Sequence, residues 1–310
     1  MAINMKGKDL ISIHDLSQEE VWQILKTTEF LKTIQKTGDV YQPLKGKTLG
    51  MIFTKASTRT RVAFEVAIWQ LGGHGLFLSA QDLQLRRGET IADTARVLSR
   101  YLDGIMIRTF DHNDVIELAR YASIPVINGL TDLLHPTQAL ADIFTIYEKK
   151  GRLEGIKLTY VGDGNNVAHS LMFAGAKVGM QVTIATPPGY QPDPAIVAQA
   201  QEDARKTGAS IQLAQDPHAA VRGADVIYTD VWASMGQEAE HDRRVKDLGD
   251  YQVNPRLMQE AGEGVLFMHC LPAHRGEEVT DEVADSPQSV IFDEAENRLH
   301  VHKAILALVM

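Results

Sequence analysis

The chain is poor in cysteine and has no long hydrophobic segment. Its 310 residues include a single cysteine, Cys270, so no disulfide can form within the chain. The opening residues, MAINMKGKDLISIHDL, contain no apolar run of the length found in signal peptides. No run approaches the roughly 20 apolar residues that span a bilayer. These absences predict a cytoplasmic protein in a reducing compartment, with no membrane partner.

Positive charge is also in the minority. The chain has 31 Lys and Arg residues against 40 Asp and Glu residues, which gives a formal net charge of -9. The electrostatic field of a negatively charged protein repels a polyanion unless a local basic patch overrides it, so nucleic acid is not an expected partner. Hydrophobic residues at 44% and charged residues at 23% match ordinary globular usage, which excludes disordered and collagen-like classes.

Short apolar segments alternate with helical patterns along the chain. In the first half, predicted strands at 47–53, 75–79, 104–108 and 124–127 alternate with helices at 60–71, 90–102 and 114–122. In the second half, a helix at 167–178 accompanies predicted strands at 157–161, 181–185, 210–213, 226–229, 265–269 and 290–292. This alternation favours right-handed crossovers and parallel sheets. The predicted fold class is α/β, with two domains that each contain a parallel sheet flanked by helices.

A predicted helix separates the two series of strands. It begins at Pro136, a residue suited to the first helical turn, and ends at Gly151. The expected divisions of the chain are a first domain over 1–135, a linking helix over 136–150 and a second domain over 151–296. An early helix at 18–33 and an amphipathic tail at 297–310 both need apolar cover, so we expect both to pack on the first domain.

The segment Ser57-Thr58-Arg59-Thr60-Arg61 lies between a predicted strand and the helix that follows it. First-turn N–H groups lack partners within a helix and lie at the positive end of its dipole. Three hydroxyl groups and the planar fork of Arg59 add further donors. This combination is typical of a phosphate site, and a capped helix with solvated arginines is the structural alternative.

The segment His135-Pro136-Thr137-Gln138 follows another predicted strand, and Arg108 ends the strand at 104–108. Loops beyond the carboxyl ends of parallel strands are where open α/β sheets bind ligands. The imidazole can donate to a carbonyl oxygen, and the carboxamide can accept from an amide. The structural alternatives are that His135 only caps the helix, and that Arg108 is only a charged residue where the strand reaches solvent.

In this order, the motifs resemble the carbamoyl-phosphate domain of the aspartate and ornithine carbamoyltransferase family. The second half contains four motifs similar to the ornithine branch: Gly162-Asp-Gly164-Asn165-Asn166, Asp230-Val-Trp-Ala-Ser234-Met235-Gly236, His269-Cys270-Leu271-Pro272 and Glu294-Ala-Glu-Asn-Arg298. The resemblance implies transfer of a carbamoyl group from carbamoyl phosphate to the side-chain amine of L-ornithine, giving L-citrulline and phosphate. It places the reaction in arginine metabolism, in either direction, without cofactor or metal, at a cleft between the domains.

The resemblance also implies which groups bind carbamoyl phosphate. They are Ser57, Thr58, Arg59, Thr60, Gln84, Arg108, His135, Gln138, Cys270, Leu271 and Arg298. The segment 57–60 would hold the phosphate. Thr60, Arg108 and His135 would donate to the carbonyl oxygen, whose negative charge grows in the transition state. Gln138 would accept from the carbamoyl NH2 group, as would the backbone carbonyl of residue 271.

The remaining implied roles concern ornithine and the assembly. The ornithine-binding residues would be Asn166, Asp230, Ser234 and Met235. Asp230 would bind the α-ammonium group and, together with Cys270, orient the reactive amine, so both join Arg108 and His135 as catalytic residues. Gln84 would reach the site of a neighbouring subunit, which implies a homotrimer or an assembly of trimers.

Other functions stay open on the residues alone. The segment Val161-Gly162-Asp-Gly164 suggests dinucleotide binding, but Val167 replaces the third glycine and no ribose-binding acid follows the next strand. A zinc site from His269, Cys270 and His274 has suitable ligands, although neighbouring strand residues point to opposite faces. The same residues also allow a sensor that binds ornithine without turnover, or a carbamoyltransferase whose acceptor is putrescine, N-acylated ornithine or aspartate.

Overall fold

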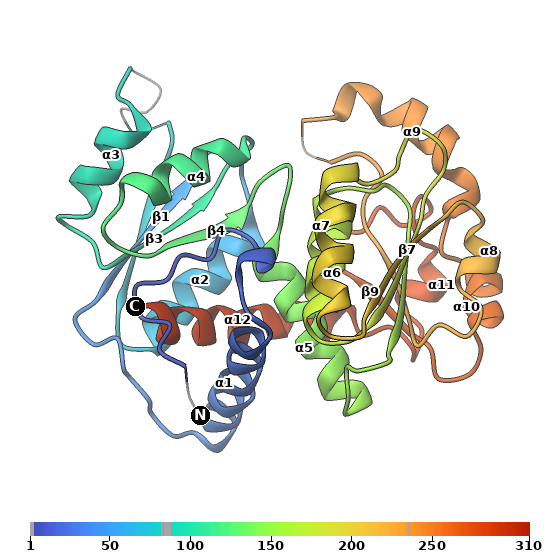
Figure 1. The fold of residues 1–310 in the computed structure, drawn as a ribbon, viewed down its shortest axis with the longest axis horizontal. Helices are drawn as coiled ribbons and strands as arrows, with labels where there is room; N and C mark the ends of the chain where they lie inside the picture. Colours follow the sequence, from blue (N-terminus) through green and yellow to red (C-terminus); the bar gives the residue numbers. More distant parts are fainter. Residues whose placement is uncertain (1–2, 82, 84–87, 235) are drawn as a thin grey trace. The chain divides into compact units, whose positions relative to one another are not determined.

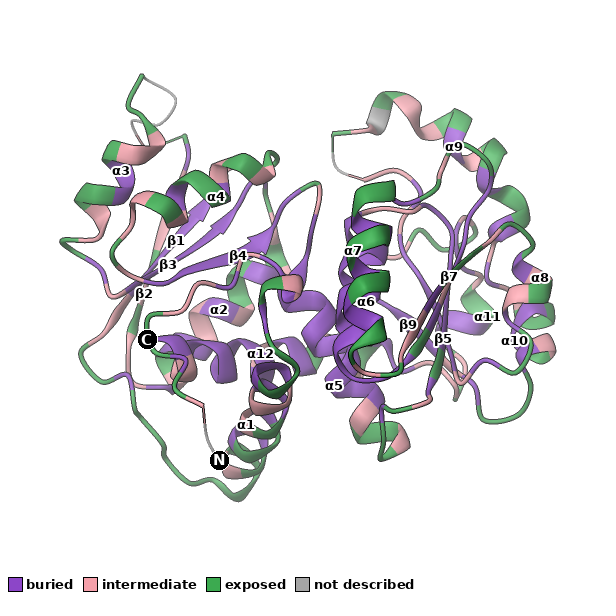
Figure 2. Cartoon of the chain, viewed as in Figure 1, coloured by how far each residue is buried: buried purple, intermediate pink, exposed green. Residues whose placement is uncertain are grey.

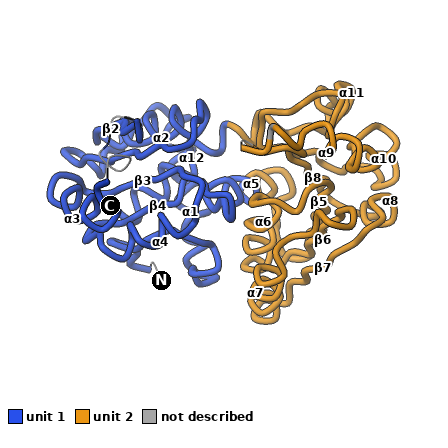
Figure 3. Tube along the Cα trace, turned by 90° about the horizontal axis from the view of Figure 1, so that it is seen from above, with its two compact units in different colours: residues 1–144, 296–310 blue, residues 145–295 orange. Residues whose placement is uncertain are grey.

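The computed structural model describes residues 3–81, 83, 88–234 and 236–310. The chain divides into two compact units, one made of 1–144 with 296–310 and the other of 145–295 (Figure 3). Each unit contains one parallel sheet flanked by helices, which confirms the predicted fold class (Figure 1). Among the described residues, no helix is long and apolar enough to cross a membrane.

The sheet of the first unit has four parallel strands in the order β2-β1-β3-β4. The strands are β1 (Thr48–Phe53), β2 (His74–Ser79), β3 (Gly104–Arg108) and β4 (Val126–Leu130). The helices between them are α2 (Thr58–Gln70), α3 (Ile91–Leu98) and α4 (His112–Tyr121). Because β2 and β3 lie on opposite sides of β1, the carboxyl ends of β1 and β3 form the switch point where such sheets bind ligands.

Two long helices from the two ends of the chain contact each other in the first unit. Helix α1 (Gln18–Thr37) begins with a capping box and ends at a left-handed glycine. Helix α12 (Ile291–Val309) contributes its residues from 296 onward to this unit. The buried Lys32 Nζ donates to Asn297 Oδ1 at 2.6 Å, which ties the two helices together.

The sheet of the second unit has five parallel strands in the order β7-β6-β5-β8-β9. They are β5 (Lys157–Val161), β6 (Gln181–Ala185), β7 (Ser210–Ala214), β8 (Val226–Thr229) and β9 (Leu266–His269). Its helices are α6 (Asn166–Lys177), α7 (Pro194–Arg205), α8 (Pro217–Ala220), α9 (His241–Leu248), α10 (Pro255–Ala261) and α11 (Asp281–Ala284). The central strands are buried (Figure 2). Here the switch point lies at the carboxyl ends of β5 and β8.

The predicted strand at 290–292 is wrong. The Val290 N–H donates to the Phe267 carbonyl at 3.0 Å, and the neighbouring bridge is isolated rather than part of a ladder. Helix α12 begins at the next residue, with Asp293 and Glu294 in its first turn, where acidic groups complement the helix dipole. A three-residue apolar run cannot by itself distinguish a strand from the buried start of a helix.

Candidate active site

The first half-site begins at the turn between β1 and α2. Ser57 is the N-cap of α2, and its Oγ accepts the Thr60 N–H at 3.2 Å. This bond occupies one first-turn donor, so the amides of Thr58 and Arg59 are those left for an anion. The Nε of the half-buried Arg59 is buried and has no hydrogen-bond partner among the described residues. A buried guanidinium nitrogen favours a charged acceptor such as a phosphate oxygen.

Two arginines converge on the hydroxyl of Thr60. Arg108, the last residue of β3, donates from Nη1 to Thr60 Oγ1 at 3.4 Å. Arg298, from α12, donates from Nη2 to the same oxygen at 2.8 Å. Thr60 is fully buried, and the two arginines are 5% and 4% exposed. Two buried positive charges therefore meet at one neutral oxygen, an arrangement that a bound anion would stabilise.

His135 and Gln138 lie at the start of α5 (Pro136–Lys150). Burial, followed by the positive charges of Arg298 and Arg108, lowers the pKa of His135 well below its usual 6.5. Its imidazole is therefore neutral near pH 7 and can donate one N–H. The Gln138 Nε2 donates to Asp142 Oδ1 at 2.8 Å. This bond makes the carboxamide oxygen the acceptor end of the side chain, which suits a ligand NH2 group.

Two buried side chains near this half-site, Lys55 and His302, were not singled out by the sequence motifs. Lys55 is 5% exposed, pairs with Asp132 at 2.9 Å and helps to lower the pKa of His135. His302 is fully buried and stacks on Phe64 with ring centroids 3.8 Å apart. Lys55 was recognisable as a cation two residues before the cap. His302 had no comparable signal, because its position depends on how α12 packs.

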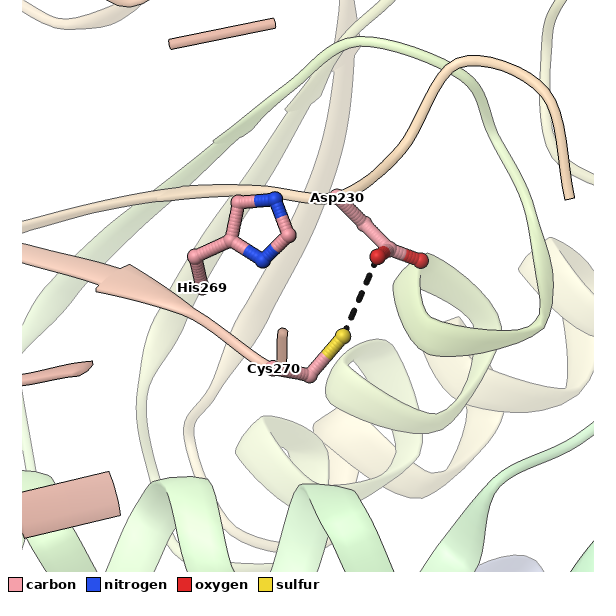
Figure 4. Close-up of side chains that lie close together, drawn as sticks. All are labelled: Asp230, His269 and Cys270. Carbon is pink, nitrogen blue, oxygen red and sulfur yellow. Dashed lines mark hydrogen bonds between the residues drawn. The ribbon is translucent and has the colours of Figure 1, made fainter. Parts of the chain in front are cut away.

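The second half-site lies at the carboxyl ends of β8 and β9. Asp230 follows β8, Cys270 follows β9, and the Cys270 Sγ donates to Asp230 Oδ1 at 3.1 Å (Figure 4). The other oxygen, Asp230 Oδ2, accepts from Asn165 Nδ2 at 2.8 Å. The Asn165 Oδ1 also caps α6. The motif had singled out Asn166, which is buried in the first turn of α6, but Asn165 is the asparagine that positions the carboxylate.

His269 organises the backbone that follows β9. Its Nε2 lies 3.0 Å from Glu278 Oε1, and its Nδ1 accepts the Leu271 N–H at 2.9 Å. The His269 N–H in turn donates to Glu294 Oε2 at 3.0 Å. Leu271 has a φ of 59°, in the left-handed region that is uncommon for a bulky residue. These bonds hold the Leu271 backbone in place, including the carbonyl that was predicted to contact the carbamoyl group.

We expected His269 and Cys270 to be unable to share a zinc ion, because neighbouring strand residues point to opposite faces. This expectation is wrong. Ligand atoms of Asp230, His269 and Cys270 all lie within 4.8 Å of one another. Cys270 lies beyond the last residue of β9, where the alternation of faces no longer applies. However, both ring nitrogens of His269 already make hydrogen bonds, to Glu278 and to Leu271, and a metal ion here would displace one of them. His274 belongs to a different cluster.

The segment after Asp230 is anchored through α9. The Ser234 N–H donates to Gln237 Oε1 at 3.0 Å. The Arg244 Nη1 donates to Asp163 Oδ2 at 2.9 Å and to the Trp232 carbonyl at 3.0 Å, which ties α9 to the segment and to the turn after β5. Two of the predicted site residues lie outside the described part of the chain, namely Gln84 and Met235.

Comparison with known proteins matches both units. Residues 8–148 match the carbamoyl-P binding domain of aspartate/ornithine carbamoyltransferase, and residues 154–309 match its Asp/Orn binding domain. The chain is 62% identical to an ornithine carbamoyltransferase of Thermococcus kodakarensis, over 100% of this chain and 98% of that protein. It is 61% identical to a Pyrococcus furiosus protein named ornithine carbamoyltransferase, anabolic, with the same coverage.

The fold agrees with these sequence matches. A solved structure of ornithine carbamoyltransferase from Pyrococcus furiosus superposes with a TM-score of 0.97 at 61% identity, over 100% of this chain and 99% of that one. The chain therefore belongs to the aspartate/ornithine carbamoyltransferase family.

Proposed function

We propose that this protein transfers the carbamoyl group of carbamoyl phosphate to the side-chain amine of L-ornithine, giving L-citrulline and phosphate. The observation that carries the proposal is the convergence of Arg108 and Arg298 on Thr60, beside a capped helix start, in a family member matched along its length. The names of the relatives support ornithine as the acceptor.

In the first half-site, the turn at 57–59 would hold the phosphate through backbone amides and the Arg59 guanidinium. Thr60, Arg108 and His135 would donate to the carbonyl oxygen. Attack by the neutral amine forms a C–N bond and places negative charge on that oxygen. The C=O double bond forms again as the C–O bond to phosphate breaks, and the phosphate leaves with that electron pair and takes up the remaining proton of the attacking nitrogen. Donors that are already in place stabilise the intermediate without reorganising at the moment of reaction. The Gln138 oxygen would accept from the carbamoyl NH2 group and select it over an acetyl group.

In the second half-site, Asp230 would bind the α-ammonium group of ornithine, and Asn166 with the 234–235 segment would contact its amino-acid end. The reactive amine is protonated at neutral pH, because an alkyl ammonium group has a pKa of about 10.4. It must lose a proton before it attacks. The hydrogen-bonded pair of Asp230 and Cys270 would accept from the amine and direct its lone pair toward the carbonyl carbon.

We also propose that the protein acts in the cytoplasm as a homotrimer, or as an assembly of trimers, in which Gln84 completes the site of a neighbouring subunit. The name of the Pyrococcus furiosus relative supports the anabolic direction, toward arginine. Light scattering after size-exclusion chromatography tests the assembly: three chain masses, or a multiple of three, are expected, and a monomer or dimer would contradict it.

A steady-state assay of citrulline formation from carbamoyl phosphate tests the activity. Ornithine, putrescine, aspartate and N-acetylornithine are compared as acceptors at equal concentration. Ornithine should be preferred, because the buried carboxylate of Asp230 would bind its free α-ammonium group, which N-acetylornithine lacks. Putrescine has no carboxylate for the contact with Asn166, and the second carboxylate of aspartate would need arginines rather than an acid at 230. Preference for another acceptor would overturn the substrate, and saturable ornithine binding without product would indicate a sensor instead.

A further inference from the structure

Three metal-ligating side chains converge in the second unit, away from Asp230 and Cys270. His241 is the first residue of α9, while His274 and Glu277 belong to the segment that follows β9. Ligand atoms from the three side chains all lie within 4.8 Å of one another. The His241 Nε2 lies 3.1 Å from Glu277 Oε2, and the His274 Nδ1 lies 3.5 Å from the same oxygen.

The backbone brings two of these groups together before any ion binds. The Glu277 N–H donates to the His274 carbonyl at 2.9 Å, which closes a turn with both side chains on it. Gln252 Nε2 donates to the carbonyls of Gly276 and Glu277 at 2.9 and 2.8 Å and holds the turn against the rest of the unit. Arg275, between the two ligands, bonds to carboxylates at 281 and 285, so its charge is directed elsewhere.

The spacing fits a tetrahedral transition-metal ion. Ligands about 2.0–2.1 Å from a tetrahedral zinc ion lie roughly 3.4 Å from one another. The two separations from Glu277 Oε2, 3.1 and 3.5 Å, bracket that value. Imidazole nitrogens suit zinc, cobalt and nickel, and three protein ligands leave a fourth position for water. The His241 Nδ1 lies 3.5 Å from Asp242 Oδ1, the carboxylate contact that commonly orients a metal-bound histidine.

We propose that His241, His274 and Glu277 form a binding site for a divalent first-row transition-metal ion, of which Zn²⁺ is the best fit. The side chains are 38%, 42% and 29% exposed, so an ion can reach them from solvent. The ion cross-links α9 to the 274–277 turn. Helix α9 anchors the segment that carries Ser234, through Arg244, and the turn leads into Glu278, which holds His269. Metal binding therefore stabilises the backbone on both sides of the second half-site.

Binding of Co²⁺, a spectroscopic substitute for Zn²⁺, to the full-length chain tests the proposal. Visible absorption and the melting temperature are followed for the wild type and for His241→Gln, His274→Gln and Cys270→Ser variants. Cys270→Ser is the matched control, because it removes the thiolate of the other cluster that could hold a metal ion. The wild type and Cys270→Ser should bind one ion with d–d bands and no thiolate charge-transfer band.

Each histidine variant should bind Co²⁺ weaker by about tenfold or more, and should lose the metal-dependent rise in melting temperature. The melting temperature without metal shows whether a variant is folded, and Glu277→Gln repeats the test if either histidine variant is not. The proposal is overturned if Co²⁺ fails to bind, if Cys270→Ser abolishes binding, or if folded ligand variants bind as the wild type does. None of these readouts depends on citrulline formation, so this proposal and the proposed activity can fail separately.

Discussion

Replacement of Thr60 by valine tests the group at the centre of the first half-site. The Thr60 hydroxyl is fully buried and accepts from Arg298 at 2.8 Å and from Arg108 at 3.4 Å. Because both guanidinium groups are donors only, the hydroxyl hydrogen is left for a third partner, which in our proposal is an oxygen of carbamoyl phosphate. Valine keeps the branched shape of threonine and removes both functions of the hydroxyl.

The two functions predict two effects of different size. Loss of one donor to a developing oxyanion raises the barrier by about 2.7–4 kcal/mol, so kcat should fall about 10²- to 10³-fold. Loss of an acceptor for a buried charged donor lowers the free energy of unfolding by about 1.5–3 kcal/mol. Only the Arg298 contact has the length of a good hydrogen bond, so we expect a single loss of about 2 kcal/mol rather than two.

The assay is steady-state citrulline formation, together with urea unfolding of the substrate-free protein. Thr60→Ser is the matched control, because it keeps the hydroxyl and removes only a methyl group, and it should keep most of the turnover. If Thr60→Val kept kcat within about threefold of the wild type while losing stability, the hydroxyl would only hold the arginines in place and its role as an oxyanion donor would be refuted.

Further predictions concern the second half-site and the buried histidines. Cys270→Ala should lower kcat by about 10²-fold or more while the melting temperature stays close to that of the wild type, and near-normal turnover would refute the assignment. Asp230→Asn should raise the KM for ornithine by about tenfold or more without weakening phosphate binding measured by calorimetry; equal weakening of both ligands would indicate a structural role. Burial, followed by the charge of Arg298, lowers the pKa of His302 well below 6.5, so the unfolded chain binds a proton there that the folded chain does not, and stability falls as the pH drops below 6.5. Between about pH 7.5 and 5.5, His302→Gln should therefore lose less of its free energy of unfolding than the wild type does, as measured by urea unfolding, and parallel losses would contradict this.

Strands in the interior of each sheet were predictable from the sequence almost to the residue. The strands at 104–108, 157–161, 181–185 and 226–229 have the predicted bounds, because each is a short segment rich in apolar and β-branched residues between turns. Helix α5 also has its predicted bounds, from the proline at its start to the glycine after it. The strand at 290–292 failed for the opposite reason: its apolar residues pack as the start of a helix, and the run itself did not show the difference.

The positions of the candidate site residues could be predicted where a local motif marks the start or end of an element. The sequence pattern placed Ser57 and Thr60 at a helix start, whereas Asp230 was singled out only by the resemblance of its motif to the ornithine branch. The groups that position them come from distant parts of the chain. Asn165 holds Asp230 across 65 residues, and Glu278 holds His269 from a loop with no pattern of its own. Such partners depend on tertiary packing, which no spacing in a single sequence specifies.

The buried arginines of the first half-site explain how a chain with a net charge of -9 would hold a dianion. Surface carboxylates more than a Debye length away are largely screened, whereas buried charges are screened much less. The buried pair Arg108 and Arg298 therefore dominates the potential at Thr60. A protonated His135 would add a third positive charge beside this pair, and burial together with those same arginines makes that form unfavourable. In the proposed site, the neutral imidazole that results would donate to the carbonyl oxygen together with Arg108, while the two buried arginines keep the positive potential that attracts the dianion.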